Sequence, residues 1–155
     1  MKKYLLHILI ISFVFLLAPT AHVASYADAE ENVRKNPDDA DAHYQLGIYY
    51  QMSAITNQDH VKAFKAFKQA IRLDPDNTTE AKYSTEHTVK ELSHYGIGIT
   101  SLAIYGSTSG GAKEQYRILK KLDTELAEAL DESISERKEM ERQRRIYEAY
   151  EGRNY

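Results

Sequence analysis

The sequence predicts an all-α protein, a short α-solenoid of two helical hairpins with a long projecting helix and a C-terminal capping helix. Three observations support this class. Apolar residues recur at helical spacing through residues 40–73. Small residues stand where paired helices would approach one another. Finally, Pro37 and Pro75 each follow an Asn or Asp and separate the periodic segments, as helix-ending prolines do.

The N-terminus has the layout of a secretory signal peptide. The chain opens with two lysines, continues with nearly unbroken apolar sequence over residues 4–18, and reaches small Ser25 and Ala27 before Asp28. This apolar run is shorter than the roughly 20 residues that span a bilayer as a helix. We therefore expect cleavage of residues 1–27, export to the periplasm and no membrane insertion afterwards. An uncleaved membrane anchor is the alternative.

The amino-acid composition excludes some classes of function. The chain has 155 residues and a net charge of −3, which suits one domain, and removal of residues 1–27 would leave −5. A mildly acidic protein lacks the concentrated basic face of a general nucleic-acid binder. The absence of cysteine excludes disulfides, so helix packing alone must hold an exported chain together.

The first hairpin is expected within residues 40–77. Residues 28–39 precede it as a polar stub helix and turn, ended by Pro37. Helices are then expected over about 40–53 and 59–73. Gly47 inside the first costs about 1 kcal/mol against alanine, which indicates close approach of the second helix. Phe67 is expected to fill the gap between helix turns.

The spacing of this hairpin resembles the tetratricopeptide repeat. Two features depart from that pattern: His43 stands where a large aromatic is usual, and the loop between the helices is four residues longer. The six matching positions are Leu46, Gly47, Tyr50, Ala63, Phe67 and Pro75.

A weaker copy occupies residues 78–123. His94, Ile97 and Gly98 repeat the first-helix signature, and Ala112 with Tyr116 repeats the second. The two copies are 51 residues apart, against 34 for directly stacked repeats. Since the extra stretch contains no glycine or proline, it predicts one long helix over about 79–105 with a projecting first half. A separate short helix broken near 84–85 is the alternative.

Residues 124–155 read as a capping helix followed by a charged tail. Leu126, Ala129, Leu130 and Ile134 give the early turns a buried face that can cover the open end of a repeat stack. The remainder mixes acidic and basic residues, which is typical of a solvated helix.

No catalytic pattern is present, so a non-enzymatic protein without cofactors is expected. The sequence has no nucleophile elbow, HExxH or P-loop, and residues 107–111 suit a turn better than an anion site. His87, Glu91 and His94 could offer metal ligands on one helix face. Chance placement or a packed histidine explains them better, and no metal is expected.

The resemblance implies a concave groove that binds a segment of another protein. An equal alternative is that the C-terminal helix fills this groove. The expected function is therefore an exported protein–protein adaptor, with a membrane-tethered or self-associating assembly factor, including a homo-oligomer, as the rival. The groove residues implied by the matching positions are Tyr44, Ile48, Gln51, Met52, Tyr95, Ile99 and Leu102.

Overall fold

The computed structural model describes residues 26–151, so nearly all of the predicted signal peptide lies outside it. Within this range the regular elements are all helices, which confirms the all-α class, and the only strand-like contact is one isolated bridge. None of the helices in residues 26–151 is both long and apolar enough to cross a membrane. The helices are α2 (Tyr26–Lys35), α3 (Ala40–Met52), α4 (Asn57–Leu73), α5 (Val89–Tyr105), α6 (Gly110–Leu122) and α7 (Thr124–Glu151).

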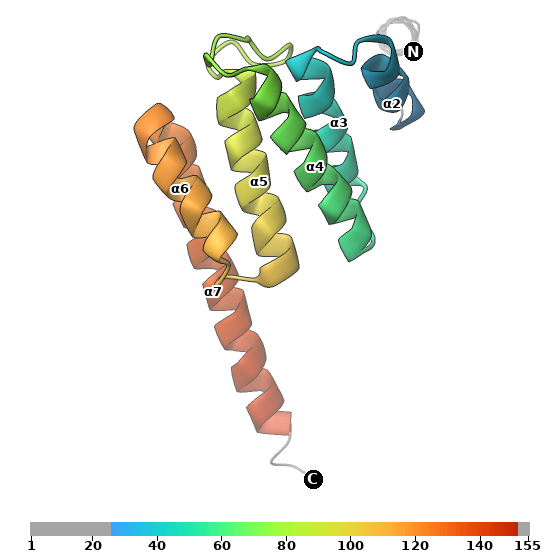
Figure 1. The fold of residues 1–155 in the computed structure, drawn as a ribbon. Coiled ribbons are helices and arrows are strands. Elements are labelled where there is room, and N and C mark those ends of the chain that lie inside the picture. Colours follow the sequence, from blue (N-terminus) through green and yellow to red (C-terminus); the bar gives the residue numbers. More distant parts are fainter. Residues whose placement is uncertain (1–25, 152–155) are drawn as a thin grey trace, which may run out of the picture.

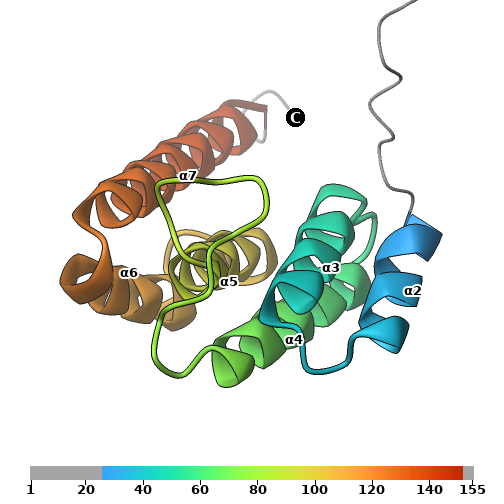
Figure 2. The same ribbon diagram turned by 90° about the horizontal axis from the view of Figure 1, so that it is seen from above.

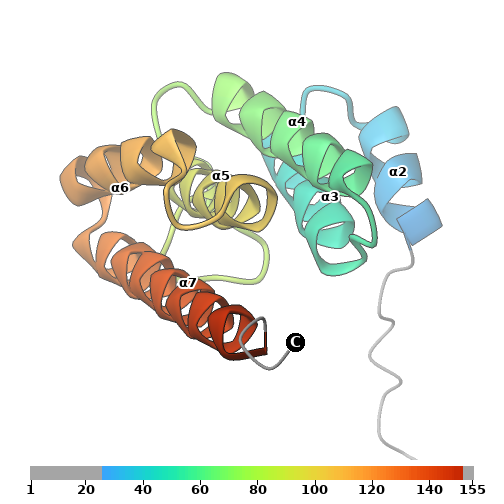
Figure 3. The ribbon, with the colours of Figure 1, turned by 90° about the horizontal axis from the view of Figure 1, so that it is seen from below.

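Each helix packs on the next helix along the chain (Figure 1). From α3 to α7 each helix contacts the next, and α5 also contacts both α3 and α7. Helix α2 packs only on α3 among the described helices. Figure 3, seen from below, shows α2 and α7 at opposite sides of the molecule, with α5 between the α3–α4 hairpin and helices α6 and α7. The helix boundaries agree with those expected, except at α5.

Side-chain caps set the start of several helices. The Asp39 side chain accepts hydrogen bonds from the Asp41 and Ala42 amides at the start of α3. Thr56 and Asp59 form a reciprocal capping box at the start of α4. Such residues accept hydrogen bonds from backbone amides that have no partner within the helix. Each cap contributes about 1 kcal/mol to the free energy of unfolding.

Phe67 fills the space between α3, α4 and α5. Its side chain has no exposed surface. A Cβ atom at Gly47 of α3 or at Gly96 of α5 would lie 2.6 Å from its ring. The prediction that Gly47 admits close packing and that Phe67 fills the gap is thus confirmed, and Gly96 supplies the matching space on the opposite wall.

A second core joins α5, α6 and α7. Leu119 of α6 and Leu130 of α7 are fully buried, and Leu102 of α5 lies beside them. A Cβ atom on Gly98 would lie 2.6 Å from Leu130. The small residue at position 98 therefore makes room for α7. Each buried leucine contributes about 1.5–3 kcal/mol.

The prediction of a long helix over residues 79–105 is wrong, and so is its alternative of a separate short helix. Helix α5 begins at Val89, and residues 74–88 form a loop without helix. Figure 2 shows this yellow-green loop passing over the end of α5. The projecting helix of the molecule is instead α7 (Figure 1).

Short polar side chains explain this difference. Asp74 Oδ1 accepts hydrogen bonds from the Thr78 and Thr79 amides, at 2.9 and 3.1 Å. Asn77 has a positive φ of 58°. Thr88 and Glu91 then form a capping box that starts α5. Because Asp, Asn, Ser and Thr offer the backbone partners outside a helix, they compete with helix formation here.

Helix α7 is held at one more point before it leaves the bundle. Glu141 accepts hydrogen bonds from the Ser107 amide at 3.0 Å and from the Ser107 hydroxyl at 2.6 Å. Gly106 ends α5 with a φ of 72°, and a Cβ atom there would lie 2.5 Å from the Glu141 carboxylate. Residues 142–151 are all exposed, as predicted for the solvated tail.

Candidate functional site

The four groove residues expected from the first hairpin have different environments. Tyr44 packs its ring 6.0 Å from that of Phe67, and burial raises its pKa to about 12, with a further contribution from the Asp41 charge. Ile48 packs against the same core. Gln51 donates to Gly96 O at 3.3 Å and to Thr100 Oγ1 at 3.1 Å, which joins α3 to α5. These three side chains thus hold the fold together.

Met52 differs from the other three. It is the last residue of α3, and its side chain is 81% exposed. It is therefore the predicted groove residue of this hairpin that is most available to a partner.

The three residues expected from the second hairpin lie in the core against α7. Tyr95 and Ile99 pack on the cluster that contains Leu102, Leu126 and Leu130. Leu102 itself is only 5% exposed. In this half of the expected groove, the chain's own C-terminal helix takes up the apolar surface.

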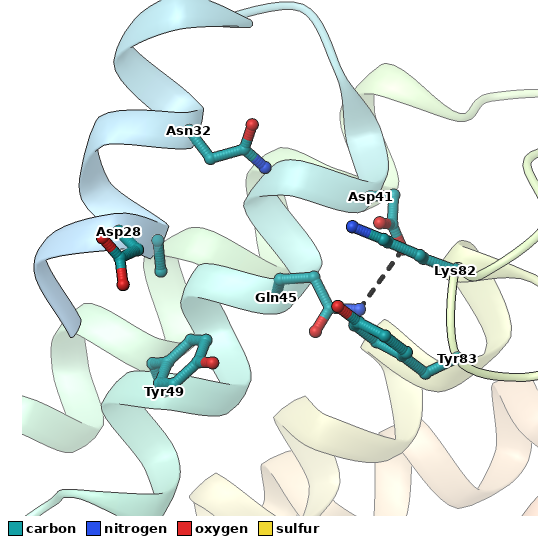
Figure 4. A pocket seen from close by; sticks show the side chains of 8 residues that line it. Asp28, Asn32, Asp41, Gln45, Tyr49, Lys82 and Tyr83 are labelled. Atoms are coloured by element: carbon teal, nitrogen blue, oxygen red, sulfur yellow. Dashed lines mark hydrogen bonds between the residues drawn. The ribbon is translucent and has the colours of Figure 1, made fainter. Parts of the chain in front are cut away.

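A cleft of about 240 Å³ lies on the neighbouring side of α3, where it meets α2 and the 74–88 loop. Figure 4 shows Asp41, Gln45 and Tyr49 extending from α3 into this cleft. Lys82 and Tyr83 come from the loop. The cleft residues are Asp28, Ala29, Asn32, Asp41, Gln45, Tyr49, Lys82 and Tyr83.

Hydrogen bonds fix the loop wall of the cleft. Asp41 Oδ1 accepts from the Lys82 backbone amide at 3.1 Å and from Gln45 Nε2 at 3.4 Å (Figure 4). The Lys82 ammonium lies 5.4 Å from the centre of the Tyr83 ring. The adjacent Ala81 is buried against Ala40 and Ala70. The loop is thus anchored at Ala81 and at Lys82.

The cleft carries charged, polar and aromatic groups that can contact a ligand. It combines two carboxylates, one ammonium group, two amides and two phenol rings. Tyr83 is 75% exposed, so its ring can make contact with a ligand. Asp41, Gln45 and Tyr49 recur every four residues and share one side of α3. Met52 follows Tyr49 by three residues and continues the same side.

The histidines separate into different roles. His94 is packed, as expected, and its Nδ1 donates to Gln115 Oε1 at 2.7 Å. Burial lowers the pKa of His94, which favours the neutral ring. His43 instead lies at the surface and bonds through Nε2 to Pro37 O at 2.8 Å. The structure brings His87 and Glu91 together with Asp123, while His94 takes no part in this group.

Sequence reasoning missed the loop residues of the cleft. Lys82 and Tyr83 were assigned to a helix and so could not be placed opposite α3. The signal that was available is Thr88 followed three residues later by Glu91, which marks a helix start. That start would have left residues 78–87 as a connection that can fold back on α3.

No family model matches this chain, and neither a curated protein nor a solved structure matches it.

Proposed function

We propose that this protein is an exported, non-enzymatic adaptor that binds a segment of another protein along α3. The observation that carries this proposal is the cleft of α2, α3 and the 74–88 loop, together with exposed Met52 on the same side of α3. The resemblance to the tetratricopeptide repeat supports the choice of α3, since first helices line the binding surface in that family.

The chemistry of the cleft indicates the kind of segment. Exposed Tyr83 and Met52 can contact apolar side chains, and aromatic residues commonly supply much of the binding free energy at interfaces. Asp41 and Lys82 can pair with the backbone or with charged side chains of a partner. A partner segment with alternating apolar and polar residues would fit this surface.

Site-specific photo-crosslinking tests the proposal. A crosslinking amino acid placed at Met52 or Tyr83 of the full chain should trap the same protein from native envelope extracts. These positions are 81% and 75% exposed, so the change should leave the fold intact. The matched control is Tyr147, which is 61% exposed on α7, far along the projecting helix.

The interpretation depends on which positions crosslink. Capture at both Met52 and Tyr83, lost when the other position is changed to serine, would identify the α3 side as the binding face. Capture only at Tyr147, or none at all, would contradict the adaptor proposal. A Tyr44→Ala or Ile48→Ala variant would be a poor test, because both side chains contribute to the core.

A membrane-tethered or self-associating assembly factor is the second candidate. The projecting part of α7 favours it, because Met140, Ile146 and Tyr147 are each more than half exposed on one stretch of helix. Such a surface can pair with another helix. Native mass measurement tests the self-associating form: a dimer that Ile146→Ser with Tyr147→Ser converts to monomer would support it. A wild-type monomer at all concentrations would exclude it.

A further inference from the structure

His87, Glu91 and Asp123 converge from three separate segments of the chain. His87 lies at the end of the 74–88 loop, Glu91 in the first turn of α5, and Asp123 between α6 and α7. One ligand atom from each lies within 4.8 Å of the other two. One imidazole nitrogen and two carboxylate oxygens form a donor set that zinc accepts.

Neighbouring groups hold these side chains in place. Glu91 accepts a hydrogen bond from Asn77 Nδ2 at 2.9 Å and another from the Thr88 amide at 2.9 Å. Metal-binding carboxylates in proteins are held by similar outer hydrogen bonds.

Asp123 is held in the same way. Its Oδ1 accepts from the Leu126 amide at 3.0 Å, which leaves Oδ2 facing His87. Groups outside the three-residue set therefore hold both carboxylates in place.

The charges of the group also favour a cation. Two carboxylates stand beside a single imidazole. The His87 and Asp123 side chains are each only 14% exposed, and Glu91 is 9% exposed. Like charges at such short range and partial burial repel one another.

We propose that His87, Glu91 and Asp123 bind one divalent transition-metal ion of the zinc class. The ion displaces the proton shared by His87 Nδ1 and Asp123 Oδ2, and these atoms move apart from 2.7 Å to about 3.3 Å to form bonds of about 2.0–2.2 Å at a tetrahedral angle. It joins the 74–88 loop to the start of α7. Imidazole favours zinc over magnesium or calcium, which prefer oxygen ligands alone. The three ligands are not among the residues that line the cleft beside α3.

Calorimetric titration of the untagged, chelator-stripped full chain with Zn²⁺ tests the proposal. We expect one ion per chain, with a micromolar or lower dissociation constant. Two substitutions remove ligand charge while keeping the local fold. Glu91→Gln retains a capping-box residue, and Asp123→Asn retains a good helix cap. Each should weaken Zn²⁺ binding at least tenfold, with unchanged helix content by circular dichroism.

His94→Gln is the matched control, because His94 lies outside the group. It should bind Zn²⁺ like the wild-type chain, while His87→Gln should bind at least tenfold more weakly. The proposal is overturned if the stripped wild-type chain shows no binding at about 1 mM Zn²⁺, roughly a thousandfold above the expected dissociation constant. It is equally overturned if none of the three ligand substitutions alters binding, or if Mg²⁺ binds as tightly.

Discussion

At the scale of single residues, Phe67 is the most constrained side chain. It is fully buried between two glycines that each leave no room for a Cβ atom. Close-packed interiors respond strongly to an added methyl group, because the neighbours must move to accept it. The free energy of unfolding is therefore expected to depend on both glycines.

We expect Gly47→Ala to lower the free energy of unfolding by about 1–3 kcal/mol, even though alanine is the better helix former. The cause is overlap with the Phe67 ring. Urea denaturation followed by circular dichroism measures the change. The double variant Gly47→Ala with Phe67→Leu should lose less free energy of unfolding than the sum of the losses of the two single variants.

Gly110→Ala provides the control for this prediction. A Cβ atom on Gly110, in the first turn of α6, would meet nothing within 4 Å. This variant should be as stable as the wild-type chain or up to about 1 kcal/mol more stable. Equal losses at positions 47 and 110 would contradict the account of Phe67 packing.

The contact of Glu141 with Ser107 should depend on pH. The hydroxyl of Ser107, then its amide and finally Arg137 lower the pKa of Glu141 from 4.5 to about 2. A carboxyl group whose pKa is lower in the folded state stabilises that state above its unfolded pKa. This contribution is complete above about pH 4.5 and is lost as the pH falls toward 2.

Thermal melting of Glu141→Gln alongside the wild-type chain measures this effect. The wild-type melting temperature should be higher at pH 6–7, and the difference should shrink between about pH 4.5 and pH 2. Glu136→Gln, at an exposed position of the same helix, should show no such trend. A difference independent of pH would mean that the Glu141 charge has no part in docking α7.

At the scale of elements, the start of α5 is determined by Thr88. Its hydroxyl accepts from the Glu91 amide at 3.3 Å and donates to Asn77 Oδ1 at 2.5 Å. This cap, rather than the preceding sequence, sets the boundary between loop and helix.

Thr88→Ala should therefore lower the free energy of unfolding by about 1 kcal/mol, the usual contribution of an N-terminal cap. Thr88→Ser keeps a capping hydroxyl and should be close to wild type. Chemical denaturation of both variants makes the comparison. If alanine and serine were equally tolerated, the loop would have to be held by Ala81 and Asp74 instead.

The helices of the first hairpin could be predicted from the sequence because the residues that determine them are close together in the chain. The apolar periodicity around Phe67, the glycine at position 47 and the stop at Pro75 all lie within one hairpin. The conformation of the 74–88 loop could not be predicted in this way, because side chains distant in the sequence stabilise it. The hydrogen bond from the Lys82 amide to Asp41 joins residues 41 apart.

The residues of the candidate sites show the same difference between local and distant signals. Met52 was predicted as a groove residue from its repeat position, whereas the place of Tyr83 in the cleft depends on how the 74–88 loop folds back on α3. Similarly, the pair of His87 and Glu91 was visible from spacing. Asp123 joins them only because α6 and α7 meet beside the start of α5.

At the scale of the whole molecule, α7 has two halves with different roles. Its first turns bury Leu126 and Leu130, whereas residues 142–151 are exposed throughout. A chain ended after Arg142 should keep its melting temperature within a few degrees. Leu130→Ala should cost about 2–5 kcal/mol, because it leaves a cavity in a fully buried site. Thermal melting of the two variants distinguishes these roles, and comparable losses would contradict the division.

The packing order also bears on folding. Because each helix from α3 onward contacts its successor, most contacts join residues that are near in sequence. Proteins of this kind generally fold quickly. The loop before α5 lengthens only one of these connections, at a small entropic cost.

The position of the Phe67 ring has a consequence for how the molecule comes apart. Its pocket has one wall on α3 and another on α5, so the first hairpin, α3 with α4, has no complete interior of its own. A fragment carrying that hairpin alone should collapse without fixed side-chain positions. The intact chain should melt in a single cooperative transition, in contrast to long repeat arrays, whose ends can open independently.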